Sequence, residues 1–155
     1  MTRDHFSDVQ RMHQNERFMA YLGGIRSHTA TLAYLERNVT HWDKHGFGIW
    51  ILRDLATSEV IGRGGLRHVE IDGVEEVEVG YAFFPEFWGR GLATELAIAC
   101  VGIARDALSL DSIVADATLG NLASTRVMVK AGFEYERDIT LNGVRLVLYR
   151  RVLKL

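Results

Sequence analysis

The sequence has few residues that cross-link or stiffen a chain. Among its 155 residues there is one cysteine, Cys100, and one proline, Pro85. A single cysteine excludes an intrachain disulfide, and the N-terminus has no apolar leader segment, which together predict a cytoplasmic protein. No apolar run approaches the roughly 18 residues of a membrane-spanning helix, so we expect no membrane contact.

An excess of either charge is also lacking. The chain has 18 Lys and Arg residues against 20 Asp and Glu residues, a formal net charge of −2. A nucleic-acid-binding protein usually has a basic excess or stripe, so we expect no nucleic-acid partner. The length suits one domain, and there is no repeat, low-complexity segment or Ser/Pro-rich linker. We therefore expect a single domain over residues 1–155, helical in residues 1–46 and built around a sheet in residues 47–155.

Hydrophobic periodicity predicts interleaved helices and strands. Apolar residues recur three or four apart in segments that we expect to be helices, over residues 7–21, 29–44, 92–108 and 121–131. Short apolar or alternating runs predict strands over residues 47–52, 60–71, 74–84, 112–117, 133–137 and 144–153. Asp72-Gly73 and Asn142-Gly143 are typical of hairpin turns. This order indicates an α/β (α+β) fold with a mixed sheet.

A glycine-rich loop joins the third expected strand to the clearest helix. Gly89, Gly91 and Ala93 are spaced by two just where the helix begins. A helix start has unpaired N–H groups and a partial positive charge, and glycines let a ligand approach the backbone, so the loop suits a phosphate. A tight strand-to-helix connection explains the same glycines. The loop lacks the Gly-Lys-Ser/Thr triplet of a Walker A loop, and Thr94 fits a dinucleotide fingerprint poorly.

A second segment begins the next helix. Asn121 and Ser124 stand at its start, where both residue types are good N-caps, so capping alone explains them.

Together, the two segments resemble the GNAT N-acetyltransferases, and are most similar to the branch that includes the ribosomal-protein N-terminal acetyltransferases. The resemblance is carried by Val79-Gly80-Tyr81, by Phe87-Trp88-Gly89-Arg90-Gly91-Leu92-Ala93-Thr94-Glu95 and by Asn121…Ser124…Lys130-Ala131-Gly132-Phe133. It covers roughly residues 48–153. It implies a mixed, mostly antiparallel central sheet flanked by helices. Because residues 1–6 do not read as the family's opening strand, it also implies a truncated start or a sheet one strand short.

The resemblance implies acetyl-CoA as cofactor. The residues that it assigns to the pyrophosphate, through their backbone N–H groups, are Trp88, Gly89, Arg90, Gly91, Leu92, Ala93 and Thr94. The pantetheine arm is expected to pair with the strand end at Ala82, Phe83 and Phe84. Asn121 would bond the pantetheine and Ser124 would lie near the thiol. Lys130, with Arg126, faces either the 3′-phosphate or solvent.

Two residues depart from the family pattern. Trp88 stands where the loop usually opens with Gln or Arg, which this branch often tolerates. Met128 stands where many members have a tyrosine that protonates the departing thiolate, and a thioether cannot donate a proton. Ser124 or a bound water is then the expected general acid.

The implied reaction is transfer of an acetyl group to a primary amine by direct attack. The acceptor would be a small amine, an antibiotic or a protein N-terminus. An alkyl amine is mostly protonated near pH 7, so a general base would help, and Glu78 is the expected base because it is nearer the cofactor end of its strand than Glu76. Both glutamates also fit a solvated outer face. A backbone N–H near Ala82 and Phe83 would meet the oxyanion.

Other features bear on the acceptor. Five acidic residues gather around one hairpin and suit a cationic acceptor, although a solvated hairpin explains them equally; they are Glu70, Asp72, Glu75, Glu76 and Glu78. The two N-terminal helices would form the acceptor wall, with Tyr21 and Trp42 as contacts. His41 and His45 are four apart but no third ligand stands out, so no metal is expected. The resemblance suggests a homodimer.

Two other functions stay open. A CoA-binding regulatory or partner module with little catalysis would explain Met128, and a nucleotide-phosphate binder would explain the loop alone.

Overall fold

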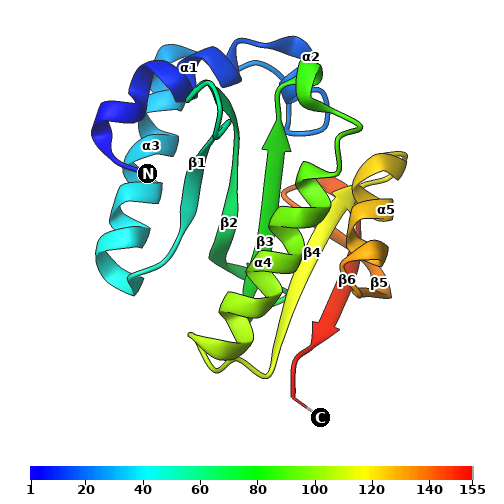
Figure 1. Cartoon of the computed structure of the whole chain (residues 1–155). Helices are drawn as coiled ribbons and strands as arrows, with labels where there is room; N and C mark the ends of the chain where they lie inside the picture. The colour runs from blue at the N-terminus through cyan, green and yellow to red at the C-terminus, as the bar shows by residue number, and fades with distance from the viewer. Residues whose placement is uncertain (155) are drawn as a thin grey trace. The chain divides into compact units, whose positions relative to one another are not determined.

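The computed structural model describes residues 1–154, and its helices and strands alternate along the chain (Figure 1). The helices are the 3-10 helices Arg3–His5 and Pro85–Phe87 and the α-helices α1 (Phe6–His13), α2 (Glu16–Met19), α3 (His28–His45), α4 (Leu92–Asp106) and α5 (Leu122–Lys130). The strands are β1 (Ile49–Arg53), β2 (Val60–Ile71), β3 (Val74–Phe83), β4 (Ser112–Thr118), β5 (Glu134–Leu141) and β6 (Val144–Val152).

The strands form a six-stranded sheet in the order β1-β2-β3-β4-β6-β5. β3 and β4 are parallel, whereas β6 is antiparallel to both β4 and β5. Within the described residues, no strand precedes β1. The expected α/β fold, with a mostly antiparallel sheet flanked by helices, is therefore confirmed.

The chain divides into two compact units. The first comprises Met1–Gly64 and Tyr81–Arg90, and the second comprises Gly65–Gly80 and Gly91–Leu155. Strands β2 and β3 run through both units, and the chain re-enters the second unit at Gly91. These boundaries differ from the change at residue 46 that the sequence suggested, and the single domain over residues 1–155 stays a prediction.

In the first unit, α1 packs against α3 (Figure 1). Val9, Tyr34 and Leu35 form a buried cluster between these helices. The single helix expected over residues 7–21 is wrong. The helix breaks because the side chain of Asn15 accepts a hydrogen bond from the Phe18 N–H at 2.9 Å and so starts a new helix, α2.

The glycines of β2 have a packing reason in the first unit. A Cβ added to Gly62 would lie 2.3 Å from the carbonyl oxygen of Ala82, so only glycine fits there. This confirms the close backbone approach that the glycines in this strand indicated.

Two tight hairpins shape the second unit. Asp72 and Gly73 have φ values of 51° and 77°, and Asn142 and Gly143 have 49° and 79°. Positive φ at both central residues is the geometry of type I′ turns, which match the twist of the strands that they join. Both predicted hairpins are therefore confirmed.

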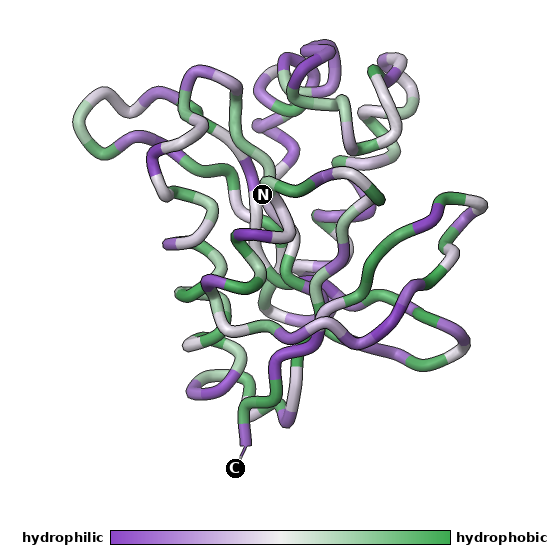
Figure 2. Tube along the Cα trace, turned by 90° about the vertical axis from the view of Figure 1, so that its right-hand side faces the viewer, coloured by the Kyte–Doolittle hydropathy of each residue, from purple (hydrophilic) through white to green (hydrophobic). Residues whose placement is uncertain are grey.

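Helices cover one face of β4 in the second unit. Both α4 and α5 contact β4, and α4 buries Ala97, Cys100 and Ala104 (Figure 1). Hydrophobic and hydrophilic residues are interspersed along the chain (Figure 2). On the face of β4 that carries Val114, a second cluster is built from Ile71, Val114, Ile139, Leu146 and Leu148.

None of the helices in the described part of the chain is long and apolar enough to cross a membrane.

Candidate functional site

The N-terminus of α4 presents backbone N–H donors in the second unit. The first helical hydrogen bond runs from Glu95 N to Gly91 O at 3.0 Å, so the N–H groups of Leu92, Ala93 and Thr94 precede it. The N-cap is Gly91, with a φ of 80°, and it has no side chain to accept from these donors. A Cβ added there would meet nothing within 4 Å. This open helix start can bind an anion.

Helices α3 and α5 begin differently. The side chains of Ser27 and Asn121 accept hydrogen bonds from backbone N–H groups at the starts of α3 and α5. These two starts are thus satisfied within the protein, whereas the N-cap residue of α4 supplies no such acceptor.

The preceding loop residues belong to the first unit. Gly89 has a φ of 75°, and a Cβ there would also meet open space. The Trp88 N–H donates to Pro85 O at 3.2 Å, and its indole Nε1 donates to Phe83 O at 2.8 Å. Arg90 donates to Glu86 O at 3.0 Å. Since the Trp88 N–H already has an acceptor, the donors for an anion begin after it.

At the end of β3, the expected pantetheine residues are packed into the first unit. Phe83 and Phe84 are buried, and the Phe84 N–H donates to Ile61 O at 2.9 Å. The Phe84 ring lies 5.1 Å from the Phe18 ring. Any contact between this strand end and pantetheine would therefore use backbone groups of Ala82 and Phe83, not these side chains.

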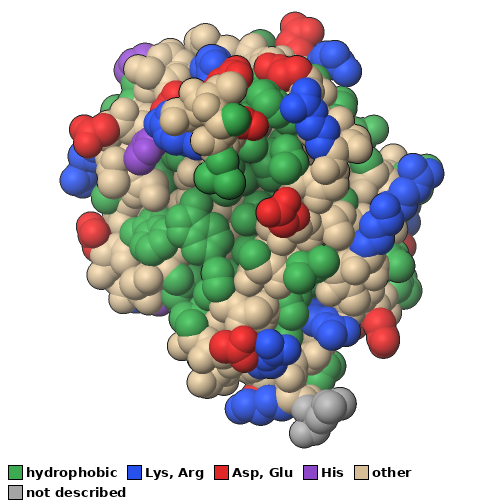
Figure 3. Space-filling model, in the orientation of Figure 1, with side chains coloured by type: hydrophobic (Ala, Val, Ile, Leu, Met, Phe, Trp, Pro, Cys, Tyr) green, Lys and Arg blue, Asp and Glu red, His purple; other side chains and the backbone are tan. Residues whose placement is uncertain are grey.

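The start of α5 shows the capping that the sequence indicated. Asn121 Oδ1 accepts from Ser124 N at 3.2 Å, and Ser124 is partly buried. Met128 is 1% exposed and is a core residue of this helix. Arg126 and Lys130 are exposed, and blue side chains gather over α5 (Figure 3).

Glu78 lies inside the second unit. Its side chain is 5% exposed, and Arg67 Nε lies 2.6 Å from its Oε2 atom. The solvated outer face that was an alternative for this residue is therefore wrong. Glu76 also has a guanidinium partner, because Arg150 Nη2 lies 2.7 Å from its Oε1 atom.

The acid that the sequence interpretation missed is Asp116 on β4. Burial, the charge of Glu78 and a hydrogen bond with Glu78 together raise the pKa of Asp116 to about 8, and Arg67 opposes this shift. The signal was present in the sequence: Asp116 is the one charged residue in the apolar run Ile113–Ala117. A lone acid in a buried strand needs a partner, which here is Glu78.

Basic side chains lie beside most carboxylates of the acidic hairpin. Asp72 pairs with Arg137 at 2.5 Å, and His68 Nδ1 lies 2.7 Å from Glu75 Oε1. With the pairs made by Glu76 and Glu78, four of the five carboxylates have a basic neighbour. The attraction for a cation is therefore smaller than the sequence alone suggested.

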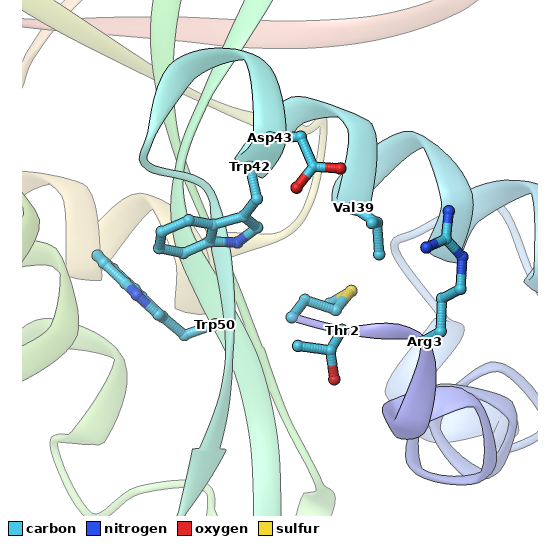
Figure 4. A pocket seen from close by; sticks show the side chains of 7 residues that line it. Thr2, Arg3, Val39, Trp42, Asp43 and Trp50 are labelled. Carbon is cyan, nitrogen blue, oxygen red and sulfur yellow. The ribbon is translucent and has the colours of Figure 1, made fainter.

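An open pocket of about 490 Å³ lies in the first unit (Figure 4). Its lining comprises Met1, Thr2, Arg3, Val39, Trp42, Asp43 and Trp50. The indole of Trp42 donates to Ile49 O at 3.0 Å, which fixes this expected acceptor residue at the pocket wall. The other, Tyr21, is 52% exposed and is not part of that lining. None of the predicted cofactor residues lines this pocket either.

The histidines of α3 and the cysteine of α4 contact neighbouring groups of the protein. The His41 and His45 rings lie 4.6 Å apart, and His41 Nδ1 lies 2.9 Å from Phe47 O. Cys100 is fully buried, which raises the pKa of its thiol to about 12 and makes it a core residue.

The comparisons with known proteins agree with this fold. A sequence model described as "Acetyltransferase (GNAT) domain" matches residues 1–134. YkkB, an uncharacterized protein of Bacillus subtilis, is 29% identical over 133 residues, which are 86% of this chain and 77% of that protein. The chain therefore belongs to the GNAT acetyltransferase family, and is an acetyltransferase.

Solved structures show the same fold. An acetyltransferase from Agrobacterium tumefaciens has a TM-score of 0.83 at 22% identity, covering 97% of this chain and 86% of that one. Spermidine N-acetyltransferase from Vibrio cholerae, in complex with CoA and spermine, has a TM-score of 0.75 at 18% identity, covering 99% of this chain and 92% of that one. The family match includes the N-terminal helices, which the motifs alone did not cover.

Proposed function

We propose that this acetyltransferase uses acetyl-CoA to acetylate a primary amine by direct attack, as the branch with the ribosomal-protein N-terminal acetyltransferases does. The observation that carries the proposal is the open N-terminus of α4. In a chain of this family, uncapped donors after two glycines of positive φ suit the pyrophosphate of CoA.

The residues present fit this group. A Cβ at Gly89 or Gly91 would point into open space, so the loop leaves room beside its backbone. In the second unit, the proposed donors for the pyrophosphate are the N–H groups of Gly91 through Thr94. Arg126 and Lys130 on α5 add exposed positive charge for a further phosphate.

The end of β3 supplies a further place for the cofactor. In the described residues the two strands pair at one register position, Glu78↔Val114. Past this position, backbone N–H and C=O groups of the strand would serve as donors and acceptors for an extended ligand arm. The backbone of Ala82 and Phe83 is the proposed partner of pantetheine. The Asn121 amide nitrogen is a further donor, since its oxygen caps α5.

When bound, acetyl-CoA supplies an activated acetyl thioester. The protein's part is to orient the amine, to accept one of its protons and to return a proton to the sulfur. Ser124 is the proposed donor to the sulfur because Met128 is buried and has no proton to give. The site carboxylates of the second unit are the proposed proton acceptors.

The test is CoA release from acetyl-CoA with a panel of amines: a polyamine, an aminoglycoside and a peptide with a free N-terminus. We expect turnover with at least one class and CoA-dependent thermal stabilisation. A protein that neither binds CoA nor releases it from acetyl-CoA contradicts the proposal. Stabilisation by ATP or NAD but not by CoA would instead support a nucleotide-phosphate binder.

A CoA-binding module with little catalysis is the second candidate, favoured by the buried Met128 in place of a proton donor. It predicts tight CoA binding with no turnover on any amine. The panel separates the two functions because binding and turnover are measured on the same sample. A cytoplasmic location and a homodimer stay predictions.

A further inference from the structure

Asp116 and Glu78 project from the same face of the sheet. Glu78 on β3 is in register with Val114 on β4, and side chains at paired positions lie on the same side. Asp116 is two residues beyond Val114 along β4, so it returns to that face. The two carboxyl groups are therefore diagonal neighbours at the position where β3 and β4 pair.

Charged groups from each neighbouring strand surround this pair. Arg67 on β2 contacts Glu78 at 2.6 Å, and Glu78 hydrogen-bonds Asp116. On β6, Leu148 is opposite Asp116, and Arg150, opposite Val114, contacts Glu76 at 2.7 Å. Glu78 and Arg67 are thus the charged groups that act on the pKa of Asp116, and the apolar Leu148 lies opposite it on β6.

An unsatisfied hydroxyl lies beside the pair. Thr118 is two residues beyond Asp116 on the same face, and its Oγ1 atom is buried without a hydrogen-bond partner among the described residues. A buried polar atom without a partner is uncommon and indicates a group that the protein alone does not supply. Asp116 therefore lies between a carboxyl neighbour and a hydroxyl that can contact a bound molecule.

The arrangement determines where the proton resides. Two adjacent carboxyl groups do not both ionise readily, so the pair holds one proton near neutral pH. Burial and the neighbouring carboxylate of Glu78, which hydrogen-bonds Asp116, favour the protonated form of Asp116. Accordingly, the pKa of Asp116 is raised to about 8.

We propose that Asp116, rather than Glu78, accepts the proton of the acceptor amine, and that Glu78 and Arg67 are positioning residues that set its proton affinity. Access supports this assignment, because Asp116 is only partly buried whereas the side chain of Glu78 is 5% exposed and engaged by Arg67. The inference rests on the proposed acetyl transfer to an amine.

The protons balance in this scheme. Ionised Asp116 takes one proton from the ammonium group and becomes a neutral acid. The neutral amine forms the new N–C bond to the acetyl carbon as the C–S bond breaks. Ser124 gives its hydroxyl proton to the sulfur, which departs as the thiol of CoA, and the second proton of the amine replaces it on Ser124. Asp116 then returns its proton to solvent.

The test is the pH dependence of kcat/KM, measured with acetyl-CoA and the best amine of the panel. Wild-type activity should rise with pH and level off above about 8. Asp116→Asn should lose this rise and about 10²–10⁴-fold in kcat/KM, the usual contribution of a general base. Glu78→Gln should keep a rise with a midpoint at lower pH, because it removes the negative neighbour. The control, Asp106→Asn, changes an exposed acid at the end of α4 in the same unit and should follow the wild type.

Each variant is also tested for CoA binding and for a cooperative thermal transition, which separates misfolding from lost chemistry. An Asp116→Asn variant that folds, binds CoA and keeps the wild-type pH rise overturns the inference and leaves the proposed function intact. Loss of the rise in Glu78→Gln, with Asp116→Asn unaffected, overturns it in favour of Glu78. Wild-type protein that neither binds CoA nor turns over overturns the proposed function, and with it this inference.

Discussion

Replacing Asp116 by asparagine should remove one source of the pH dependence of the free energy of unfolding. The pKa of Asp116 is raised to about 8, whereas an aspartate in the unfolded chain has a pKa of about 3.9. Between these values the folded state binds one proton more than the unfolded state. This contribution to stability is therefore fully present below about pH 3.9 and is lost as the pH rises to about 8.

The magnitude follows from the linkage. Each pH unit within this window lowers the free energy of unfolding of the wild type by up to about 1.4 kcal/mol. From pH 5 to pH 7.5 the accumulated loss is about 2–3 kcal/mol. Asparagine has nearly the shape of the protonated acid and does not titrate, so the Asp116→Asn variant should gain this amount relative to the wild type. In a chain of this size that corresponds to a relative increase in Tm of roughly 5–10 °C.

The assay is urea or thermal unfolding of both proteins at closely spaced pH values from 5 to 8. Asp106→Asn is the matched control. Asp106 is exposed and its pKa is lowered by its hydrogen bond with Arg105, so its linkage lies below this pH window. Parallel stability curves for Asp116→Asn and the wild type would refute the claim that Asp116 holds a proton in the folded protein.

Three further predictions concern the cofactor site and the core. Gly91→Ala and Gly143→Ala both force alanine into φ values near 80° with open space around the Cβ. Both variants should therefore lose about 1 kcal/mol of stability. Calorimetry should show weaker CoA binding only for Gly91→Ala. Asn121→Asp keeps the capping oxygen, so it should retain stability while raising the KM for acetyl-CoA. Asn121→Ala should raise the KM and also lower the free energy of unfolding by about 1 kcal/mol. Equal effects on KM and stability in both variants would remove Asn121 from the proposed cofactor site. The Cys100 thiol, buried and with a pKa raised to about 12, should react with a thiol reagent at pH 8 only after denaturant is added, and fast labelling of the native protein would contradict its core position.

Local signals in the sequence predicted the elements well. The two hairpins follow from Asp72-Gly73 and Asn142-Gly143, because few residues adopt the positive φ values of a type I′ turn. The start of α5 follows from Asn121, whose side chain caps the helix. The break before α2 was missed because the same capping by Asn15 was hidden within a continuous helical period.

The partners of the site acids could not be predicted in the same way. Glu78 and Arg67 face each other across a hairpin, so their contact follows from the turn once its register is known. The neighbour relation between Glu78 and Asp116 depends instead on a parallel pairing of β3 with β4, which are separated along the chain by the whole of α4. No local pattern specifies such a register. The buried acid in β4 was a visible anomaly, but its partner was not.

The charge balance around Asp116 links amine binding to amine activation. When Asp116 carries the one proton of the Asp116–Glu78 pair, the opposite charges of Glu78 and Arg67 cancel and the site has no net charge. An ammonium group that enters beside it favours the state in which Asp116 is ionised, because the negative charge then has a cationic neighbour. Binding of the acceptor thus lowers the pKa of the group that must take up its proton, and a neutral molecule of the same shape has no such effect. Under the proposed function, the site would therefore discriminate in favour of amines through the protonation of Asp116, even though most carboxylates of the adjacent hairpin are already paired.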